Sequence, residues 1–388
     1  MAKGSDSILK QLSLFRRGAR DIREIILANL AMISEIPSPT FDESARVAFF
    51  QQRLSECGLS NCSIDEAGNA VGLMPGERDN NILLVSHADT LFPKSVDHTV
   101  TLNPKTVRGP GVADNGLGLA ALASMPSLLA HLGIHLESTL GIMATSQSLG
   151  RGNLRGLSFF LKNRPLPIRA ALCVEGAPLG RLSFSSIGMM RGEIRVVVPD
   201  EYDWTRFGQR NAIFALNEVI NLINAIRVPR RPRTNIIIGS VRAGASYDTM
   251  PTTASLLLEI RSEAAGMVRE ILQSIRDIAE EVTTRTGANV TVDIFARRRP
   301  GGIPFAHPLA KQSRAIMRRL KVKPRIVPSM SELAAFIQYG IPAVTIGLTE
   351  AEHIGEPDET IQIEPVFTGM AQLLALMLAI DGGLCDED

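Results

Sequence analysis

The chain has few aromatic residues, few cysteines and no excess of charge of either sign. Aromatic residues make up 5% of its 388 residues, and 41 lysines and arginines balance 40 aspartates and glutamates. Because nucleic acids and anionic membranes attract a net positive surface, this balance argues against both as partners. Four scattered cysteines are too few for a disulfide framework or a thiolate zinc site, which indicates a reducing compartment.

Long uninterrupted apolar runs are also missing. The two most apolar segments, 116–136 and 369–380, are either interrupted by Pro126 and His131 or too short to span a bilayer. They are typical of buried helices instead. The N-terminal twenty residues carry charges throughout and contain no apolar core of a signal peptide, so we expect a cytoplasmic protein.

The apolar residues that are present follow an alternating strand and helix pattern. Short strand-like runs occur at 82–85, 140–144, 170–174 and 343–346, with helical stretches such as 117–132 between them. This order predicts an α/β fold with a mostly parallel sheet and flanking helices.

The pattern changes between about residues 188 and 299. There the order is strand, helix, strand, strand, helix, strand, a split unit that can stand as a small ferredoxin-like α+β domain. We therefore predict a main domain formed by residues 1–187 and 300–388, with 188–299 inserted into it. Within the first part, Thr40 and Glu43 have the spacing of a capping box at the start of a helix that ends near Gly58.

Two histidines and several carboxylates follow predicted strands. The run 82–85 leads directly into His87 and Asp89, which places an imidazole and a carboxylate at the carboxyl end of a strand, where open α/β sheets bind ligands. A neutral imidazole suits zinc, and Asp89 could orient it. An isolated pair of this kind can also simply cap a strand.

Three more residues occupy comparable positions. Asp114 lies in a glycine-rich turn before an apolar helix, where an N-cap role would explain it equally well. Glu175 directly follows the strand 170–174. His353 follows the strand 343–346, in a loop where a single histidine is usually only solvated. If these four strand ends meet at one edge of a sheet, their side chains form one site.

In this order the segments HADTLFP, RGPGVADNGLG, CVEG and AEHIGEPDE resemble the zinc-dependent exopeptidase and amidohydrolase family, a metallopeptidase family that includes aminoacylase, glutamate carboxypeptidase and succinyl-diaminopimelate desuccinylase. The resemblance extends over nearly the whole chain. It implies a phosphorylase/hydrolase-like fold, an inserted lid domain through which two chains dimerise, and a small peptide or N-acyl amino acid as substrate. In the lid it includes Asn211 and Arg261, which we take as substrate-binding residues. An arginine fork matches a carboxylate in geometry, but Arg261 could also serve only in a salt bridge of the lid.

The resemblance also implies a ligand set for two zinc ions. His87, Asp114 and Glu175 would surround one ion, and Asp114 and His353 would bind the other, with Asp89 as the catalytic residue that holds His87. Cobalt or manganese could replace zinc in such a site.

Two residues depart from the family pattern. Where the family has two consecutive glutamates, a general base and a metal ligand, this chain has Gln147 and Ser148. An amide cannot accept a proton at neutral pH, and loss of a general base costs a factor of about 10² to 10⁴. A serine hydroxyl is a poor replacement for a carboxylate ligand, so we expect one well-bound zinc ion and a weakened second site.

The departures leave two hypotheses open. One is a metal-dependent hydrolase with altered catalysis, in which a glutamate near His353, at position 350, 352 or 356, replaces the missing base. The other is a non-catalytic metal- or ligand-binding protein that keeps the fold. The inserted segment contains no histidine, although the family usually places one there to stabilise the oxyanion, and this supports the second hypothesis.

Overall fold

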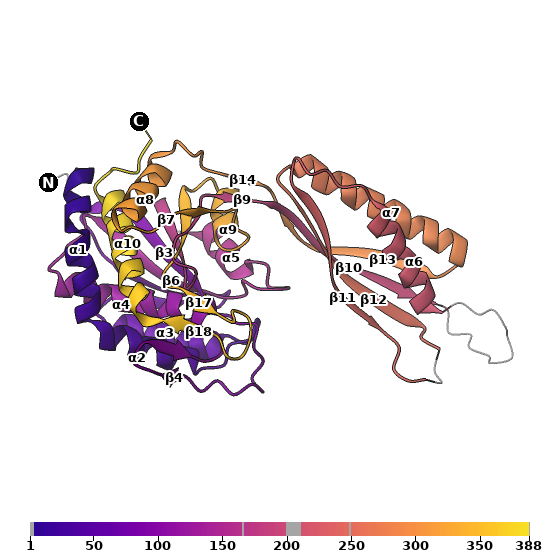
Figure 1. Cartoon of the computed structure of the whole chain (residues 1–388), viewed down its shortest axis with the longest axis horizontal. Coiled ribbons are helices and arrows are strands. Elements are labelled where there is room, and N and C mark those ends of the chain that lie inside the picture. Colours follow the sequence, from indigo (N-terminus) through magenta and orange to yellow (C-terminus); the bar gives the residue numbers. More distant parts are fainter. Residues whose placement is uncertain (1–3, 165–166, 199–210, 248–249, 388) are drawn as a thin grey trace. The chain divides into compact units, whose positions relative to one another are not determined.

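The chain folds into two compact units (Figure 1). The computed structural model describes residues 4–164, 167–198, 211–247 and 250–387. One unit consists of Met1–Ser186 with Gly302–Asp388, and the other of Ile187–Gly301. The divisions predicted from the sequence, at 187/188 and 299/300, lie one and two residues from these bounds.

The first unit is built on an eight-stranded sheet whose centre is parallel. The strand order is β1-β2-β6-β3-β7-β16-β8-β15, and the neighbours β6, β3, β7 and β16 all run in the same direction. These four contain the predicted apolar runs, so the mostly parallel sheet is confirmed. The bounds are β1 Ser60–Ile64, β2 Ala70–Met74, β3 Arg78–His87, β6 Ser138–Thr145, β7 Ile168–Glu175, β8 Arg181–Ser183, β15 Arg325–Ile326 and β16 Ala343–Gly347.

Helices cover both faces of this sheet. Successive residues of its central strands point to opposite faces, and the residues on both faces are apolar. On β3, Ile82 and Leu84 pack in one core with the larger helix layer, and Leu83 and Val85 pack in a second core with the smaller layer. The larger layer is α1 Ser5–Asp21, α2 Arg23–Ser34, α3 Ser44–Glu56, α4 Leu117–His131, α8 Pro308–Arg319 and α10 Ile363–Asp381; the smaller is α5 Arg155–Asn163 and α9 Leu333–Gln338.

The C-terminal helix α10 is apolar and long enough to cross a membrane by length and composition, but 89% of its most apolar window is buried inside the protein. The segment therefore packs as a core helix, as its sequence predicts. His307, just before α8, caps that helix by accepting a hydrogen bond from the backbone amide of Leu309.

Two smaller sheets complete the first unit and its connections. One joins β17 (Ala351–Glu352), β18 (Thr360–Gln362), β5 (Thr106–Arg108) and β4 (Thr101–Leu102), so the segment around His353 is hydrogen-bonded near the loop that leads to Asp114. The other pairs β9 (Ser185–Ser186) with β14 (Gly301–Gly302).

The inserted unit has a four-stranded antiparallel sheet in the order β11-β12-β10-β13. Helices α6 and α7 share one apolar core with its strands. Along the chain the elements are β10 Gly188–Val197, α6 Ala212–Ala225, β11 Thr234–Ala243, β12 Thr253–Ser262, α7 Ala265–Thr286 and β13 Asn289–Arg298.

One fully buried cation, Arg46, lies beside the end of β3 and joins separate segments of the first unit by hydrogen bonds. The guanidinium of Arg46 is 0% exposed and donates to the carbonyl oxygens of Ser34, Ile36 and Ala88. Burial lowers the pKa of Arg46 to about 10, while the nearby Asp89 carboxylate acts in the opposite direction.

We predict that Arg46→Met lowers the free energy of unfolding by about 3 kcal/mol, because three buried carbonyls lose their donor and Asp89 loses its cation. Urea unfolding of the metal-free protein measures this change. Arg155→Met, at an exposed position at the start of α5, is the matched control. Equal midpoints for the two variants would contradict the role of Arg46.

Candidate metal centre

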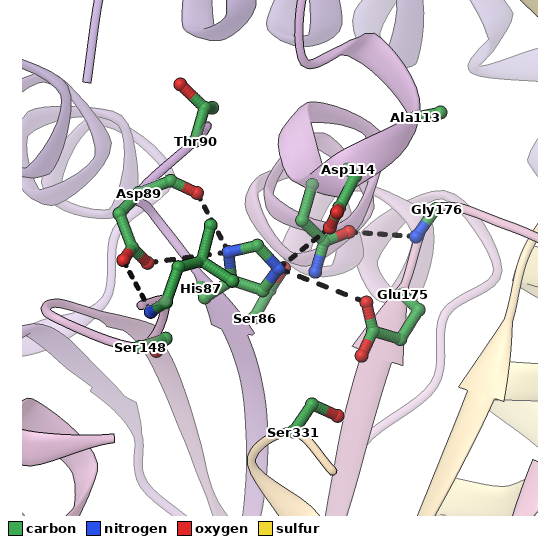
Figure 2. Close-up of polar contacts among 12 residues, drawn as sticks. Ser86, His87, Asp89, Thr90, Ala113, Asp114, Ser148, Glu175, Gly176 and Ser331 are labelled. Carbon is green, nitrogen blue, oxygen red and sulfur yellow. Dashed lines mark hydrogen bonds and ion pairs between the residues drawn. The ribbon is translucent and has the colours of Figure 1, made fainter. Parts of the chain in front are cut away.

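Three predicted ligands meet at one edge of the central sheet. His87 is the last residue of β3 and Glu175 the last of β7, and these neighbouring strands are parallel. Asp114 comes from the short helical turn η1 (Val112–Gly116). The imidazole Nε2 of His87 lies 3.0 Å from an Asp114 oxygen and 4.0 Å from a Glu175 oxygen, and Figure 2 shows both carboxylates directed at it. The ligand atoms of the three residues all lie within 4.8 Å of one another.

The hydrogen bond made by Nδ1 of His87 determines which ring nitrogen is available to a metal ion. Nδ1 lies 2.9 Å from the backbone oxygen of Asp89, and since a carbonyl only accepts, Nδ1 donates. Nε2 is therefore the ring nitrogen left to bind a metal ion, and it faces Asp114 and Glu175. Two carboxylates and an imidazole lone pair at this spacing form the donor set that zinc uses, with an open position for water or substrate. The residues present thus fit a divalent metal ion.

In the absence of a metal these groups interact strongly. Burial alone lowers the pKa of His87, but hydrogen bonds to Asp114 and Asp89 raise that pKa well above its usual value. Burial raises the pKa of Glu175, against the opposing effect of Arg181, whose guanidinium lies 4.0 Å away. For Asp114, burial raises the pKa, but the hydrogen bond and charge of His87 outweigh it and the net pKa is lowered.

The loop that carries Asp114 is held by backbone and side-chain hydrogen bonds. Glu359 accepts from the backbone amides of Ala113 and Asp114, at 2.8 and 3.2 Å. Asn115 donates to the Val174 carbonyl and accepts from the Gly176 amide, which ties the loop to the end of β7. Because α4 begins only at Leu117 and the Asp114 carboxylate faces His87, the alternative N-cap role for Asp114 is not used.

Asp89 positions His87 differently from the way the sequence suggested. Its carboxylate oxygen is 3.5 Å from Nδ1, farther than its backbone oxygen at 2.9 Å. The second carboxylate oxygen accepts instead from the Thr40 hydroxyl and the Leu149 amide, each at 2.8 Å. Asp89 therefore fixes both the ring and the chain after β6.

The predicted capping box at Thr40 and Glu43 is wrong. Helix α3 begins at Ser44 after Glu43, and no side-chain hydrogen bond caps it. Thr40 binds Asp89, and Glu43 accepts from the backbone amide of Gln147 at 2.9 Å. Thr40 and Glu43 have the spacing of a capping box, but both side chains instead form hydrogen bonds with residues far along the chain.

Gln147 and Ser148 follow the end of β6 as predicted. Gln147 has a positive φ of 52°, and its buried side-chain oxygen accepts no hydrogen bond from the described residues. The Ser148 hydroxyl lies 3.1 Å from the Thr145 hydroxyl. Both residues are at the edge of the sheet that carries His87.

His353 belongs to a second group, with Glu356 and Asp358. Its side chain is 54% exposed, and Nδ1 lies 2.8 Å from Asp358, whose hydrogen bond raises the pKa of His353. The segment is nevertheless tied to the Asp114 loop, because Glu359 also accepts from the Gly355 amide. Of the neighbouring glutamates, Glu350 lies 3.4 Å from Arg325.

The two predicted substrate-binding residues lie in the inserted unit. Asn211 caps α6 by accepting from the Ile213 amide at 2.8 Å, and Arg261 pairs with Glu259 on the same strand. Their substrate role stays a prediction.

Sequence reasoning missed several buried charged residues near the centre. Glu332 and Glu359 are 2% and 0% exposed, and Arg181 reaches Glu175 from β8. No local motif identifies them, because each reaches the centre through contacts between distant parts of the chain.

Parts of the chain are similar to known peptidases. A profile of Peptidase family M28 matches residues 69–147, a stretch that contains His87 and Asp114. Carboxypeptidase G2 from Pseudomonas sp. (strain RS-16) is 22% identical over 276 residues, which cover 67% of this chain and 64% of that protein, less than two thirds of its length. These matches support the zinc exopeptidase and amidohydrolase family that the sequence resembles.

Solved structures of several peptidases share the fold. A tripeptidase from Staphylococcus aureus superposes with a TM-score of 0.74 at 18% identity and covers 92% of this chain and 98% of its own. An M20 family metallo-carboxypeptidase from Sulfolobus solfataricus gives 0.74 at 12% identity, covering 92% and 99%. Human carnosine dipeptidase 1 gives 0.75 at 11%, covering 96% and 99%. The mixed α/β fold is therefore that of the M20 peptidases.

We predict that Asp89→Asn weakens zinc binding by only about tenfold, the low end of the usual range for residues that orient a ligand, since the backbone carbonyl still holds Nδ1. His87→Ala should remove binding altogether. Calorimetric titration of the metal-free protein with zinc measures both, with the exposed Asp97→Asn as control. An Asp89→Asn loss as large as that of His87→Ala would show that the carboxylate, not the carbonyl, positions the ring.

Proposed function

We propose that the protein is a metal-dependent hydrolase that acts on a peptide or N-acyl amide bond of a small substrate, with altered catalysis. The observation that carries this proposal is the group of His87, Asp114 and Glu175 at one edge of the sheet, with Nε2 of His87 directed toward both carboxylates. The fold and the related peptidases support the same reaction class.

In this proposal each residue has a role of its own. His87, Asp114 and Glu175 would hold the ion, and Asp89 would keep His87 in the correct tautomer. A bound zinc ion polarises a carbonyl and lowers the pKa of water. The Asp114 side chain is 32% exposed, whereas His87 and Glu175 are almost fully buried, so substrate would approach from the Asp114 side.

The proposed reaction has no identified proton acceptor. Gln147 stands where the family has its base and cannot take a proton, and Glu43 binds the backbone amide of Gln147. The rival proposal, a binding protein that keeps the fold and the metal but has no turnover, rests on this observation.

Further features remain proposals. The ion is zinc, with cobalt or manganese as substitutes, and one ion binds well because a serine stands at position 148 in place of a carboxylate ligand. Carboxypeptidase, tripeptidase and dipeptidase relatives support a small peptide or N-acyl amino acid as substrate. The inserted unit acts as a lid and dimerises two chains, Arg261 and Asn211 contact substrate, and the protein works in the cytoplasm.

Elemental analysis of protein purified without chelators should find one divalent ion per chain, and none in His87→Ala. The expected reason is charge: two carboxylates around His87, with a serine at position 148, do not balance two divalent ions. Two ions per chain would contradict this reasoning, and no ion together with no hydrolysis of dipeptides or N-acyl amino acids would defeat the proposed function.

Replacing both substituted residues, Gln147→Glu with Ser148→Glu, should raise the rate of hydrolysis by about 10² to 10⁴, because it restores a general base. The rate is measured on the same substrate panel as the parent. Adding His87→Ala to the double variant should abolish the gain. A parent already as fast as the double variant would exclude the rival binding protein and require another base.

A further inference from the structure

A buried glutamate outside the predicted site lies next to it. Glu332 is 2% exposed and directly precedes α9. Its carboxylate accepts a hydrogen bond from the Thr145 hydroxyl at 3.3 Å. Thr145 is the last residue of β6 and pairs with His87 in the register between β6 and β3. Glu332 therefore reaches the carboxyl ends of the strands that form the metal centre.

The same hydroxyl connects Glu332 to the substituted position. The Thr145 oxygen lies 3.1 Å from the Ser148 oxygen and 3.3 Å from Glu332. A carboxylate from a distant part of the chain thus approaches the place where the family has a glutamate.

The charges around the centre do not balance without a cation. Within the described part of the chain, no lysine or arginine pairs with Glu332, and Arg181 is the guanidinium that approaches Glu175, at 4.0 Å. With His87 neutral, as a metal ligand would be, Asp114, Glu175 and Glu332 bring three negative charges against the one positive charge of Arg181. The remaining two negative charges equal the charge of one divalent ion, and buried carboxylates without a counter-charge are costly.

We propose that Glu332 supplies the third carboxylate charge of the metal centre, in place of the one missing at Ser148, so that the centre is complete for a single divalent cation. This inference rests on the proposed metal-dependent function and assigns it a residue that the family pattern does not predict.

A purely structural role for Glu332 predicts a different effect of its replacement on stability and on zinc affinity. As the residue before α9 it could serve only that helix, but α9 has six residues and the Glu332 side chain makes no capping hydrogen bond. A structural glutamate would change stability equally with and without zinc. A glutamate of the metal centre changes the affinity for zinc.

The test is zinc affinity, measured by competition calorimetry on the metal-free full-length chain at pH 7. We expect Glu332→Gln to bind zinc about 10- to 100-fold more weakly than the parent, the range seen when a group supporting a metal site is removed. Glu332→Asp keeps the charge and should stay closer to the parent. Glu281→Gln, an exposed glutamate of α7, is the matched control and should bind as the parent does.

Thr145→Val is the second variant, because it removes the hydrogen bond to Glu332 while keeping the side-chain shape. It should also weaken zinc binding. If Glu332→Gln does not fold, the zinc affinity of Thr145→Val tests the role of Glu332. The role of Glu332 would be overturned if both Glu332→Gln and Thr145→Val bound zinc as tightly as the parent. It would also be overturned if Glu332→Gln and Glu332→Asp lost zinc affinity equally. If the parent itself binds no zinc, the proposed function fails instead.

Discussion

The hydrogen bond from Nδ1 of His87 to the backbone oxygen of Asp89 determines what the rest of the centre can do. It keeps the Nδ1 proton on the side away from Asp114 and Glu175, and it directs Nε2 toward these carboxylates. Asp89 is itself fixed by Thr40 and Leu149. The end of β3 is further held by Arg46, which donates to the Ala88 carbonyl between the two residues. A ring orientation held by so many partners suits a metal ligand, since it needs no rearrangement on binding.

Much of this arrangement follows from local sequence patterns. The apolar runs of β3, β6, β7 and β16 are short and lie between turn residues, and parallel strands bring their carboxyl ends to one edge. The positions of His87 and Glu175 could therefore be predicted from the strands that precede them. Asp114 could be predicted only as one of two alternatives, because its spacing fits a helix cap as well as a ligand.

The remaining contacts could not be predicted from the sequence, because they join residues with no pattern in common. Glu332 and Thr145 are 187 positions apart, and nothing near Glu332 marks it as different from a surface glutamate. Thr40 and Glu43 show the opposite error: their spacing matches a local motif, but the contacts with Asp89 and Gln147 determine their orientation. Local propensity is a weak guide wherever buried polar groups compete for the same side chain.

Glu359 joins two parts of the chain that the inserted unit separates in sequence. One of its oxygens accepts from the amides of Ala113 and Asp114, and the other from the amide of Gly355. Until this glutamate has been synthesised, those amides lack this acceptor, and Asn115 alone of the two side chains ties the Asp114 loop to another part of the chain. A nascent chain that ends before residue 359 therefore lacks the acceptor that joins the Asp114 loop to the segment around Gly355.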